Sequence, residues 1–454
     1  MFPTSPPTEN SRARARSRMD GLYFVLLGSA IFLLFGIALQ IGSPHSLSDF
    51  RFLYNGARCV VKGVDPYKPS EFIRVFLADG GDLGRGADRS NNLEMAHHMY
   101  LPTSMVIAPI AMVPWKAASI LWTTLTACVF IVGSALMWDL AADYAPILSG
   151  FLIFVMLASN ELTLAIGNAA GIVIGLCCIS VWCFVRNRFE VIGVICLGIG
   201  LLLKPHDAGL IWLYFLIAGR AFRKRALQAF LVTLVLGVLA TLWVTHVAPD
   251  WLPELRSNLA FISARGHLND PGPTSMAGRG ILMVISMQSA VSMFRDDPRI
   301  YNPVTYIVCG TLFLMWMRAT LKSRYTQAQT YLALGAVAAL TMLPVYHRLG
   351  DAKLLLLTVP GCALLWAEGG LTGRFAFLIT AAGIAMTGDL EWAVMIASIR
   401  LLHLPNSAFS SDIVMAAQIL PAPCILLTVT CYFLWAYIRR APDQTAAGVK
   451  MARP

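Results

Sequence analysis

The chain has 454 residues, of which 57% are hydrophobic and 13% are charged, and its formal net charge is +10. A soluble globular protein cannot hide this much apolar surface from water, so the composition excludes that class. Lys and Arg gather beside apolar runs, where they orient membrane segments and meet lipid headgroups, so the positive charge does not predict nucleic-acid binding. The runs lack the alternation of barrel strands, and we therefore predict an all-α, polytopic transmembrane protein.

The N-terminal segment carries four arginines immediately before the first apolar run. A secretory signal peptide would have a shorter apolar core and a small-residue cleavage site. We therefore predict that residues 1–20 form a basic cytoplasmic tail and that the run after it is a retained membrane span.

Apolar runs separated by polar or basic breaks predict about twelve spans within one membrane domain, residues 21–438. The predicted spans are residues 21–41, 115–137, 146–159, 169–185, 190–203, 208–219, 228–247, 304–317, 327–345, 354–367, 374–388 and 417–438. A cytoplasmic N-terminus places the basic clusters between spans, and a C-terminal tail of residues 439–454, in the cytoplasm, as the positive-inside rule requires. We expect a plasma (inner) membrane protein with both termini cytoplasmic.

Two long segments, residues 42–114 and 248–303, then lie outside the cytoplasm. In the first, apolar side chains recur at helical spacing over residues 49–62, which predicts an amphipathic helix at the membrane interface. Residues 80–92 are polar and rich in glycine, and we interpret them as a mobile loop.

Two apolar stretches of these outer segments are predicted to be re-entrant. Residues 101–115 are broken by three prolines, and residues 281–293 are too short to span a bilayer, so the latter could also form a surface helix. We expect such segments to roof a cavity that opens both to lipid and to the extracytoplasmic space.

Charged residues are almost absent from the predicted span interiors and accumulate at the outer helix ends. Ion-coupled carriers need such groups near the bilayer midplane, whereas an enzyme that acts at one membrane face needs them at that face. The groups at the outer ends are Asp49, Asp65, Lys204, His206, Asp207, His347, Arg348, Asp351 and Lys353. This distribution favours an enzyme with an extracytoplasmic active site.

Four short motifs stand at the predicted outer helix ends. They are Ser48 to Tyr54 followed by Gly63 to Tyr67, Tyr100-Leu101-Pro102, Gly167-Asn168 followed by Leu203 to His206, and Tyr346 to Asp351. Together they resemble glycosyltransferase family 87, in the GT-C superfamily of membrane enzymes that use polyprenyl-phosphate sugars. The resemblance implies inverting transfer of mannose or another hexose from a polyprenyl-phosphate donor to a hydroxyl of a lipid or glycan acceptor.

In that family the carboxylate of the acidic-aromatic motif after the first span is the general base, and its match here is Asp49. A neutral hydroxyl is a poor nucleophile, and a positioned carboxylate can take its proton as the glycosyl bond loosens. A place at a helix N-terminus predicts a lowered pKa for Asp49. The alternative is a helix-start residue stabilised only by the helix dipole.

The donor phosphate must be held and then stabilised as it leaves, which requires cationic donors. We predict that His347, Arg348, Lys204 and His206 bind it. The alternatives are that Lys204 and Arg348 reach to lipid headgroups, and that His206 and Asp207 cap the next helix.

Five further residues are predicted to contact the sugar or the acceptor: Tyr54, Tyr67, Tyr100, Asn168 and Asp351. Interface anchoring by the tyrosines and helix capping by Asn168 are the alternatives, and the family often has Gln at that place. Because no acidic pair is placed to bind a metal-nucleotide, we predict no nucleotide sugar, no metal and no cofactor.

Two other classes of function compete with the transferase. A transporter or flippase for a lipid-linked envelope precursor would also use a lateral groove and basic residues, but it should show polar groups continuing through the bilayer. A non-catalytic scaffold in an envelope-assembly complex would leave the polar cluster without a purpose.

Overall fold

The computed structural model describes residues 9–43, 46–273, 284–323, 325–389 and 419–440. The chain is an all-α polytopic membrane protein, as predicted. Among the described residues, six helical stretches are long and apolar enough to cross a membrane by length and composition. Shorter apolar helices pack beside them.

The helical body contains twelve α-helices of the described chain, and each predicted span overlaps one of them, although residues 417 and 418 of the last predicted span lie outside the described residues. They are α1 (Glu9–Gly42), α6 (Trp115–Ala141), α7 (Pro146–Leu157), α9 (Ala170–Arg186), α10 (Glu190–Leu203), α11 (Pro205–Ile217), α12 (Arg220–Val247), α15 (Pro298–Lys322), α16 (Gln327–Met342), α17 (Val359–Glu368), α18 (Gly370–Met386) and α21 (Pro421–Arg440). A 3-10 segment, η2 (Leu349–Thr358), leads into α17. The core lies mainly along α9, α16 and η2, whose side chains are largely buried.

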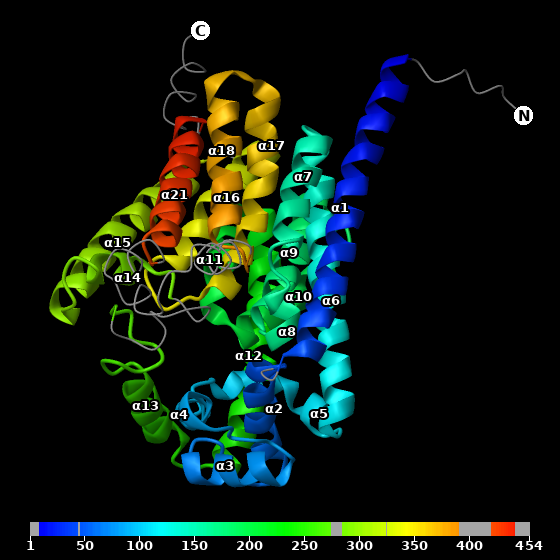
Figure 1. The fold of residues 1–454 in the computed structure, drawn as a ribbon. Helices are drawn as coiled ribbons and strands as arrows, with labels where there is room; N and C mark the ends of the chain where they lie inside the picture. The colour runs from blue at the N-terminus through cyan, green and yellow to red at the C-terminus, as the bar shows by residue number, and fades with distance from the viewer. Residues whose placement is uncertain (1–8, 44–45, 274–283, 324, 390–418, 441–454) are drawn as a thin grey trace, which may run out of the picture.

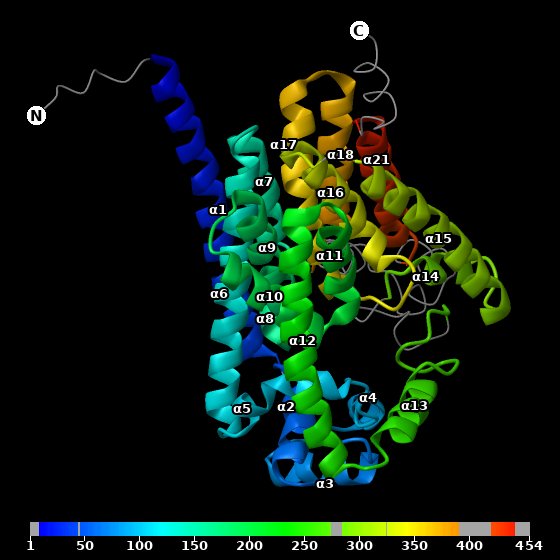
Figure 2. The same cartoon turned by 180° about the vertical axis from the view of Figure 1, so that it is seen from behind.

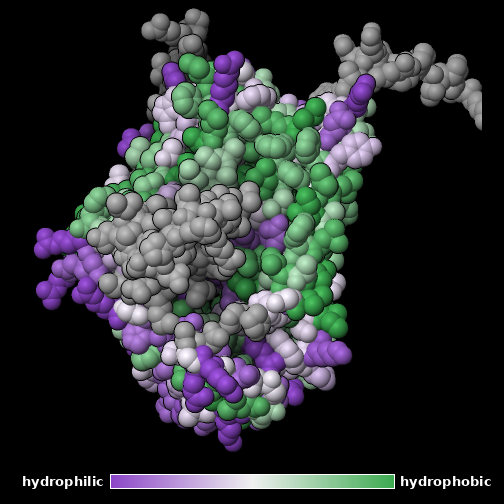
Figure 3. All heavy atoms as spheres, viewed as in Figure 1, coloured by the Kyte–Doolittle hydropathy of each residue, from purple (hydrophilic) through white to green (hydrophobic). Residues whose placement is uncertain are grey.

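Short helices form the rest of the described structure. They are α2 (Ser48–Val61), α3 (Pro69–Ala78), α4 (Gly86–Met95), η1 (Pro102–Ile107), α5 (Ala108–Ala111), α8 (Leu162–Ile166), α13 (Trp251–Ile262) and α14 (Met287–Ser292). We call α2 to α5, η1 and α13 the distal helices, because they lie at the end of the molecule opposite to the start of α1 and the end of α21 (Figures 1 and 2). On the face drawn in Figure 3, hydrophobic residues dominate the body and hydrophilic residues gather at the distal end.

Predictions for the distal segments agree with the structure in part. The predicted amphipathic helix is α2, and the proline-rich stretch forms η1 and α5. The loop predicted for residues 80–92 is wrong in its second half, where α4 begins at Gly86. The reason is tertiary, because Met95 at the end of α4 packs on a small core of α2 and α3 side chains. Residues 281–283 of the predicted second re-entrant stretch lie outside the described residues, and α14 forms within its remainder.

The end of the body away from the distal helices is held by ion pairs. Arg186 contacts Asp139 at 2.9 Å and Asp143 at 2.8 Å, and Arg18 contacts both carboxylates at 3.2 Å. These contacts join α1, α6 and α9 near their ends. Two arginines from distant parts of the sequence therefore share one pair of carboxylates at this end of the body.

Stacked aromatic rings fix α2 to the body. Phe50 is fully buried, and its ring stacks on Trp122 with centroids 4.4 Å apart and on Trp115 at 5.5 Å. Just before α2, the Leu47 N–H donates to the Ala165 carbonyl at 2.7 Å. The first turn of α2 is therefore held against α6 and α8.

Replacing Phe50 with Ala is expected to lower the free energy of unfolding by about 3–5 kcal/mol, because a buried aromatic side chain leaves a cavity. Phe50→Leu should lower the free energy of unfolding by a smaller amount, because leucine fills part of the cavity. The measurement is reversible unfolding in detergent micelles, with Phe294→Ala as the control because that side chain is 84% exposed. Equal losses for Phe50→Ala and Phe294→Ala would contradict the anchoring role of Phe50.

Candidate active site

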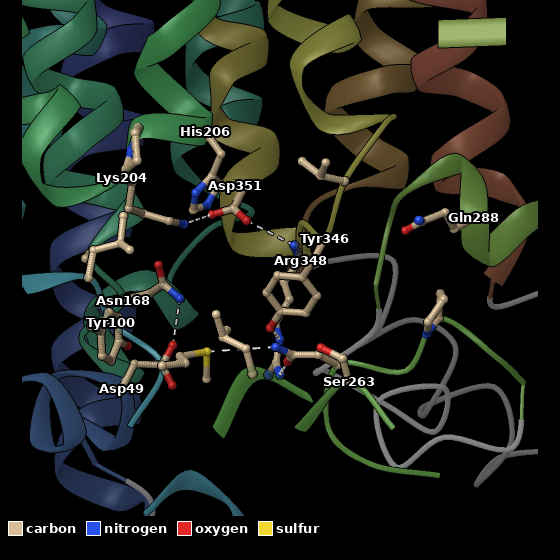
Figure 4. Close-up of a pocket in the computed structure, with 18 of the residues that line it drawn as sticks. Asp49, Tyr100, Asn168, Lys204, His206, Ser263, Gln288, Tyr346, Arg348 and Asp351 are labelled. Carbon is tan, nitrogen blue, oxygen red and sulfur yellow. Dashed lines mark hydrogen bonds and ion pairs between the residues drawn. The ribbon is translucent and has the colours of Figure 1, made fainter. Parts of the chain in front are cut away.

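A cavity of about 570 Å³ lies where the distal helices meet the helical body. Most of the predicted site residues line it, and Figure 4 shows them converging from different parts of the chain. The predicted residues in the wall are Asp49, Tyr100, Asn168, Lys204, His206, Arg348 and Asp351.

Breaks between helices bring these side chains together. Gly167 ends α8 in the left-handed region at φ 68°, and a Cβ there would lie 2.8 Å from Phe50 and Leu47 side-chain atoms, so glycine is required to place Asn168. Lys204 is non-helical, with φ −144° and ψ 82°, and lies between α10 and α11 because Pro205 starts the second helix. Interruptions between helices therefore place Asn168 and Lys204 in the cavity wall.

Asp49, in the first turn of α2, accepts a hydrogen bond of 2.6 Å from the Asn168 side-chain amide. Asn168 is held in turn, because its oxygen accepts the Ala170 N–H at 2.8 Å. Burial raises the pKa of Asp49, and the opposing effects of Arg348, Asn168 and Lys204 do not cancel this rise.

The predicted lowering of the Asp49 pKa by the helix terminus is therefore wrong. The Asp49 carboxylate faces Asn168, and the position before α2, Leu47, makes no side-chain cap. Desolvation in the cavity wall dominates the local charge balance. A raised pKa suits a group that must accept a proton, provided that it remains ionised at the working pH.

Changing Asn168 to Asp is expected to shift the acid limb of the pH–rate profile to higher pH. A second carboxylate would face Asp49 in place of an amide donor, which raises the pKa of Asp49 further. A base works only when deprotonated, so activity is lost at higher pH as the medium is acidified. The measurement is the rate between pH 5 and 9, with Asn168→Gln retaining the amide as control. An unmoved acid limb in Asn168→Asp would contradict this pairing.

Lys204 is bound between two carboxylates. Its ammonium donates to Asp351 and lies 3.2 Å from the Asp207 carboxylate. Burial lowers the pKa of Lys204, but Asp207 and Asp351 outweigh this effect and the net shift is upward. The side chain therefore points into the protein, and reaching to lipid headgroups is not its arrangement here.

Arg348 lies in the same cavity wall as Asp49 and immediately precedes η2. Its backbone N–H donates to Asp351 at 3.0 Å, and its guanidinium donates to the Tyr346 hydroxyl and approaches Asn269 at 3.4 Å. The guanidinium lines a polar cavity, where its remaining N–H groups can bind an anion.

Three predicted site residues are not in the cavity wall. His347 is fully buried behind it, with Nε2 3.2 Å from Asp207. Tyr54 and Tyr67 are buried as well, and their hydroxyls donate to the carbonyls of Val113 and Tyr100 at 2.9 and 3.0 Å. Tyr67 and His347 therefore pack behind the lining residues Tyr100 and His206, whereas Tyr54 fixes α2 to the segment between α5 and α6.

Other lining residues were not predicted. Tyr346 belongs to a motif in which only His347, Arg348 and Asp351 were assigned roles. Met99, Asn269 and Gln288 belong to no motif, so the sequence does not single them out. They reach the cavity through the folding of the two long segments around it.

Four side chains are spaced so that they could hold a metal ion: His206, Asp207, His347 and Asp351 offer ligand atoms within 4.8 Å of one another. Lys204 contacts both of these carboxylates, however, and its ammonium supplies positive charge where a metal ion would. These four side chains therefore fit a cluster in which Lys204 neutralises the carboxylates of Asp207 and Asp351.

Comparison with known proteins gives one family match. A model of glycosyltransferase family 87 matches residues 100–345, more than half of the chain. No curated protein and no solved structure matches. The matched range includes Tyr100, Asn168, Lys204 and His206, begins after Asp49 and ends before Arg348.

Proposed function

Because the chain belongs to glycosyltransferase family 87, we propose that it transfers a sugar from a polyprenyl-phosphate donor to an acceptor hydroxyl outside the cytoplasm, with inversion at the anomeric carbon. The observation that carries the proposal is that the Asp49 carboxylate shares a single cavity with two cations, Lys204 and Arg348. A base and an anion site within one cavity are what such a transfer needs.

The reaction is a single displacement. The acceptor oxygen attacks the anomeric carbon while its proton passes to Asp49, and the bond between that carbon and the phosphate oxygen breaks. Lys204 and Arg348 stabilise the negative charge that develops on the leaving polyprenyl phosphate. Attack on the face opposite to the leaving group inverts the anomeric centre, and the Asp49 carboxylate also favours the oxocarbenium-like transition state.

The walls of the cavity fit an amphiphilic donor. Apolar side chains such as Met99, Leu101 and Leu203 line it together with the polar groups. A long isoprenoid chain can lie along the apolar body while its phosphate and sugar enter the polar part. A lipid or glycan acceptor would approach from the distal helices.

The positions of the basic residues at the other end of the body support an orientation in the plasma membrane. Arg18 and Arg186 lie at the end of the body away from the cavity, as do the start of α1 and the end of α21 (Figure 1). By the positive-inside rule, this end is cytoplasmic and the cavity faces outward. A reporter fused just before residue 49 should report an extracytoplasmic position, and a cytosolic signal would overturn the orientation.

The proposed activity is tested with purified protein in liposomes. Radiolabelled polyprenyl-phosphate hexoses, supplied one at a time with a lipid and glycan extract as acceptor, should give a new labelled product. Nucleotide sugars alone should give none. Movement of the labelled donor between leaflets without a new glycosidic bond would favour a flippase, and transfer directly from a nucleotide sugar would contradict the proposed donor class.

A further inference from the structure

Asp207 lies behind the cavity wall, in the first turn of α11, and its side chain is fully buried. Its carboxylate oxygens lie 3.2 Å from the Lys204 ammonium on one side and 3.2 Å from His347 Nε2 on the other. A buried carboxylate is costly unless nearby cations compensate its charge. Lys204 provides that compensation, and the His347 ring provides a second contact, so the three side chains form one cluster.

His347 has an oxygen atom close to each ring nitrogen. Nδ1 lies 3.1 Å from the Val345 carbonyl, while Nε2 lies 3.2 Å from the Asp207 carboxylate. The ring therefore lies between its own segment and the first turn of α11, and it connects Asp207 to the segment that carries Arg348.

The two side chains that Asp207 contacts belong to different chain segments. Lys204 is the junction of α10 and α11, whereas His347 lies between Tyr346 and Arg348 in the segment that leads into η2. Asp207 therefore connects the two chain segments whose cations face the cavity (Figure 4 shows these segments from the cavity side).

We propose that Asp207 is a positioning residue that holds Lys204 and, through His347, Arg348 around a single donor phosphate. This inference rests on the proposed function, since it assumes that the two cavity cations bind that phosphate. Asp207 itself does not touch the donor. Its role is to fix the separation between Lys204 and Arg348, which do touch the donor, and to keep Lys204 protonated.

The charges around the cluster fit a phosphodiester. Asp207 and Asp351 both contact Lys204, whereas the Arg348 guanidinium has neutral hydrogen-bond acceptors within the described residues, so its positive charge can pair with the one negative charge of a phosphodiester. The remaining titratable groups facing Asp207 are His206 of its own helix and Cys177 of α9. Without Asp207, Lys204 would keep one carboxylate partner, Asp351, and the His347 ring would lose its carboxylate contact.

The decisive experiment compares the wild type with Asp207→Asn in the liposome assay, at varied donor concentration and varied pH. We expect the KM for the donor to rise at least about tenfold, with a smaller change in kcat, because the anion site loses its geometry. The alkaline limb of the profile should move to lower pH, since Asp207 helps to raise the pKa of Lys204 and donor binding is lost once Lys204 deprotonates. Asp207→Glu keeps the carboxylate and should bring both the donor KM and the alkaline limb part of the way back to their wild-type values.

Asp65→Asn is the matched control, because Asp65 is also a buried carboxylate but contacts the turn at Tyr67 instead of the cluster. It should leave the alkaline limb in place. If Asp207→Asn does not fold, His347→Gln tests the same cluster: the donor KM should rise while the alkaline limb does not move to lower pH, since Asp207 then pairs with Lys204 alone.

Three results would overturn the inference while leaving the proposed function intact. The first is that the wild type transfers sugar while folded Asp207→Asn has the same donor KM and the same alkaline limb of the pH–rate profile as the wild type. Another is an unchanged donor KM in His347→Gln. The third is a stoichiometric divalent metal in the purified wild type that Asp207→Asn loses and whose chelation stops transfer, which would assign the cluster to a metal. Absence of any wild-type transfer would instead count against the proposed function.

Discussion

Replacing Asp49 with Asn is expected to lower the rate of sugar transfer by about 10²–10⁴-fold, the usual contribution of a positioned general base. The amide has nearly the same shape and can still pair with Asn168, but it cannot accept the proton of the acceptor hydroxyl. Binding of the donor should persist, because Lys204 and Arg348 remain. The measurement is the initial rate with saturating donor and acceptor, together with a separate donor-binding isotherm.

Asp250→Asn is the matched control for this substitution. Asp250 is an exposed carboxylate just before α13, outside the cavity wall. Its replacement should change the rate by less than about twofold, as is usual for surface changes. Transfer by Asp49→Asn at a rate close to that of the wild type would contradict the base assignment.

Replacing Arg348 with Gln is expected to lower kcat/KM for the donor by about 10²–10³-fold, the usual loss when one preorganised anion donor is removed. The guanidinium meets the phosphate both in the ground state and as it leaves, so KM should rise and kcat should fall. Arg348→Lys should recover only part of the loss, because an ammonium keeps the charge but not the planar fork. Steady-state kinetics at varied donor concentration separate the two parameters.

Arg295→Gln is the control for the loss of one positive charge, since Arg295 is exposed between α14 and α15 and outside the cavity wall. Its donor kinetics should match those of the wild type. If Arg348→Gln changes only the KM for the acceptor, Arg348 contacts the acceptor, and the assignment of Arg348 to the donor phosphate is contradicted.

The helical body could be predicted from the sequence because lipid imposes a simple requirement. Backbone groups must be paired within each segment, and a sufficiently apolar run therefore forms a helix. Even the interruption at Lys204-Pro205 is visible, because proline starts a helix well but disrupts its interior. The helix α4 was missed because its polar residues show no apolar period, and only the packing of Met95 on α2 and α3 favours it.

The site was predictable as a set of motifs but not as an arrangement. The pairing of Asp49 with Asn168 joins residues 119 positions apart, which no local pattern reveals. The direction of the Asp49 pKa was mistaken because burial depends on the finished cavity, whereas the helix terminus is visible in the sequence. Asp207 looked like a helix-capping residue, since its burial between Lys204 and His347 arises only when distant helices pack.

The stereochemistry of the product tests the central claim most directly. Purified protein would be given a polyprenyl-phosphate sugar of known anomeric configuration, and the new glycosidic linkage would be determined by NMR. A single displacement with Asp49 as base predicts a product of opposite anomeric configuration, formed at the expense of the lipid-phosphate donor. Retention of the donor configuration, or no sugar passing from any polyprenyl-phosphate donor to an acceptor hydroxyl, would contradict the account.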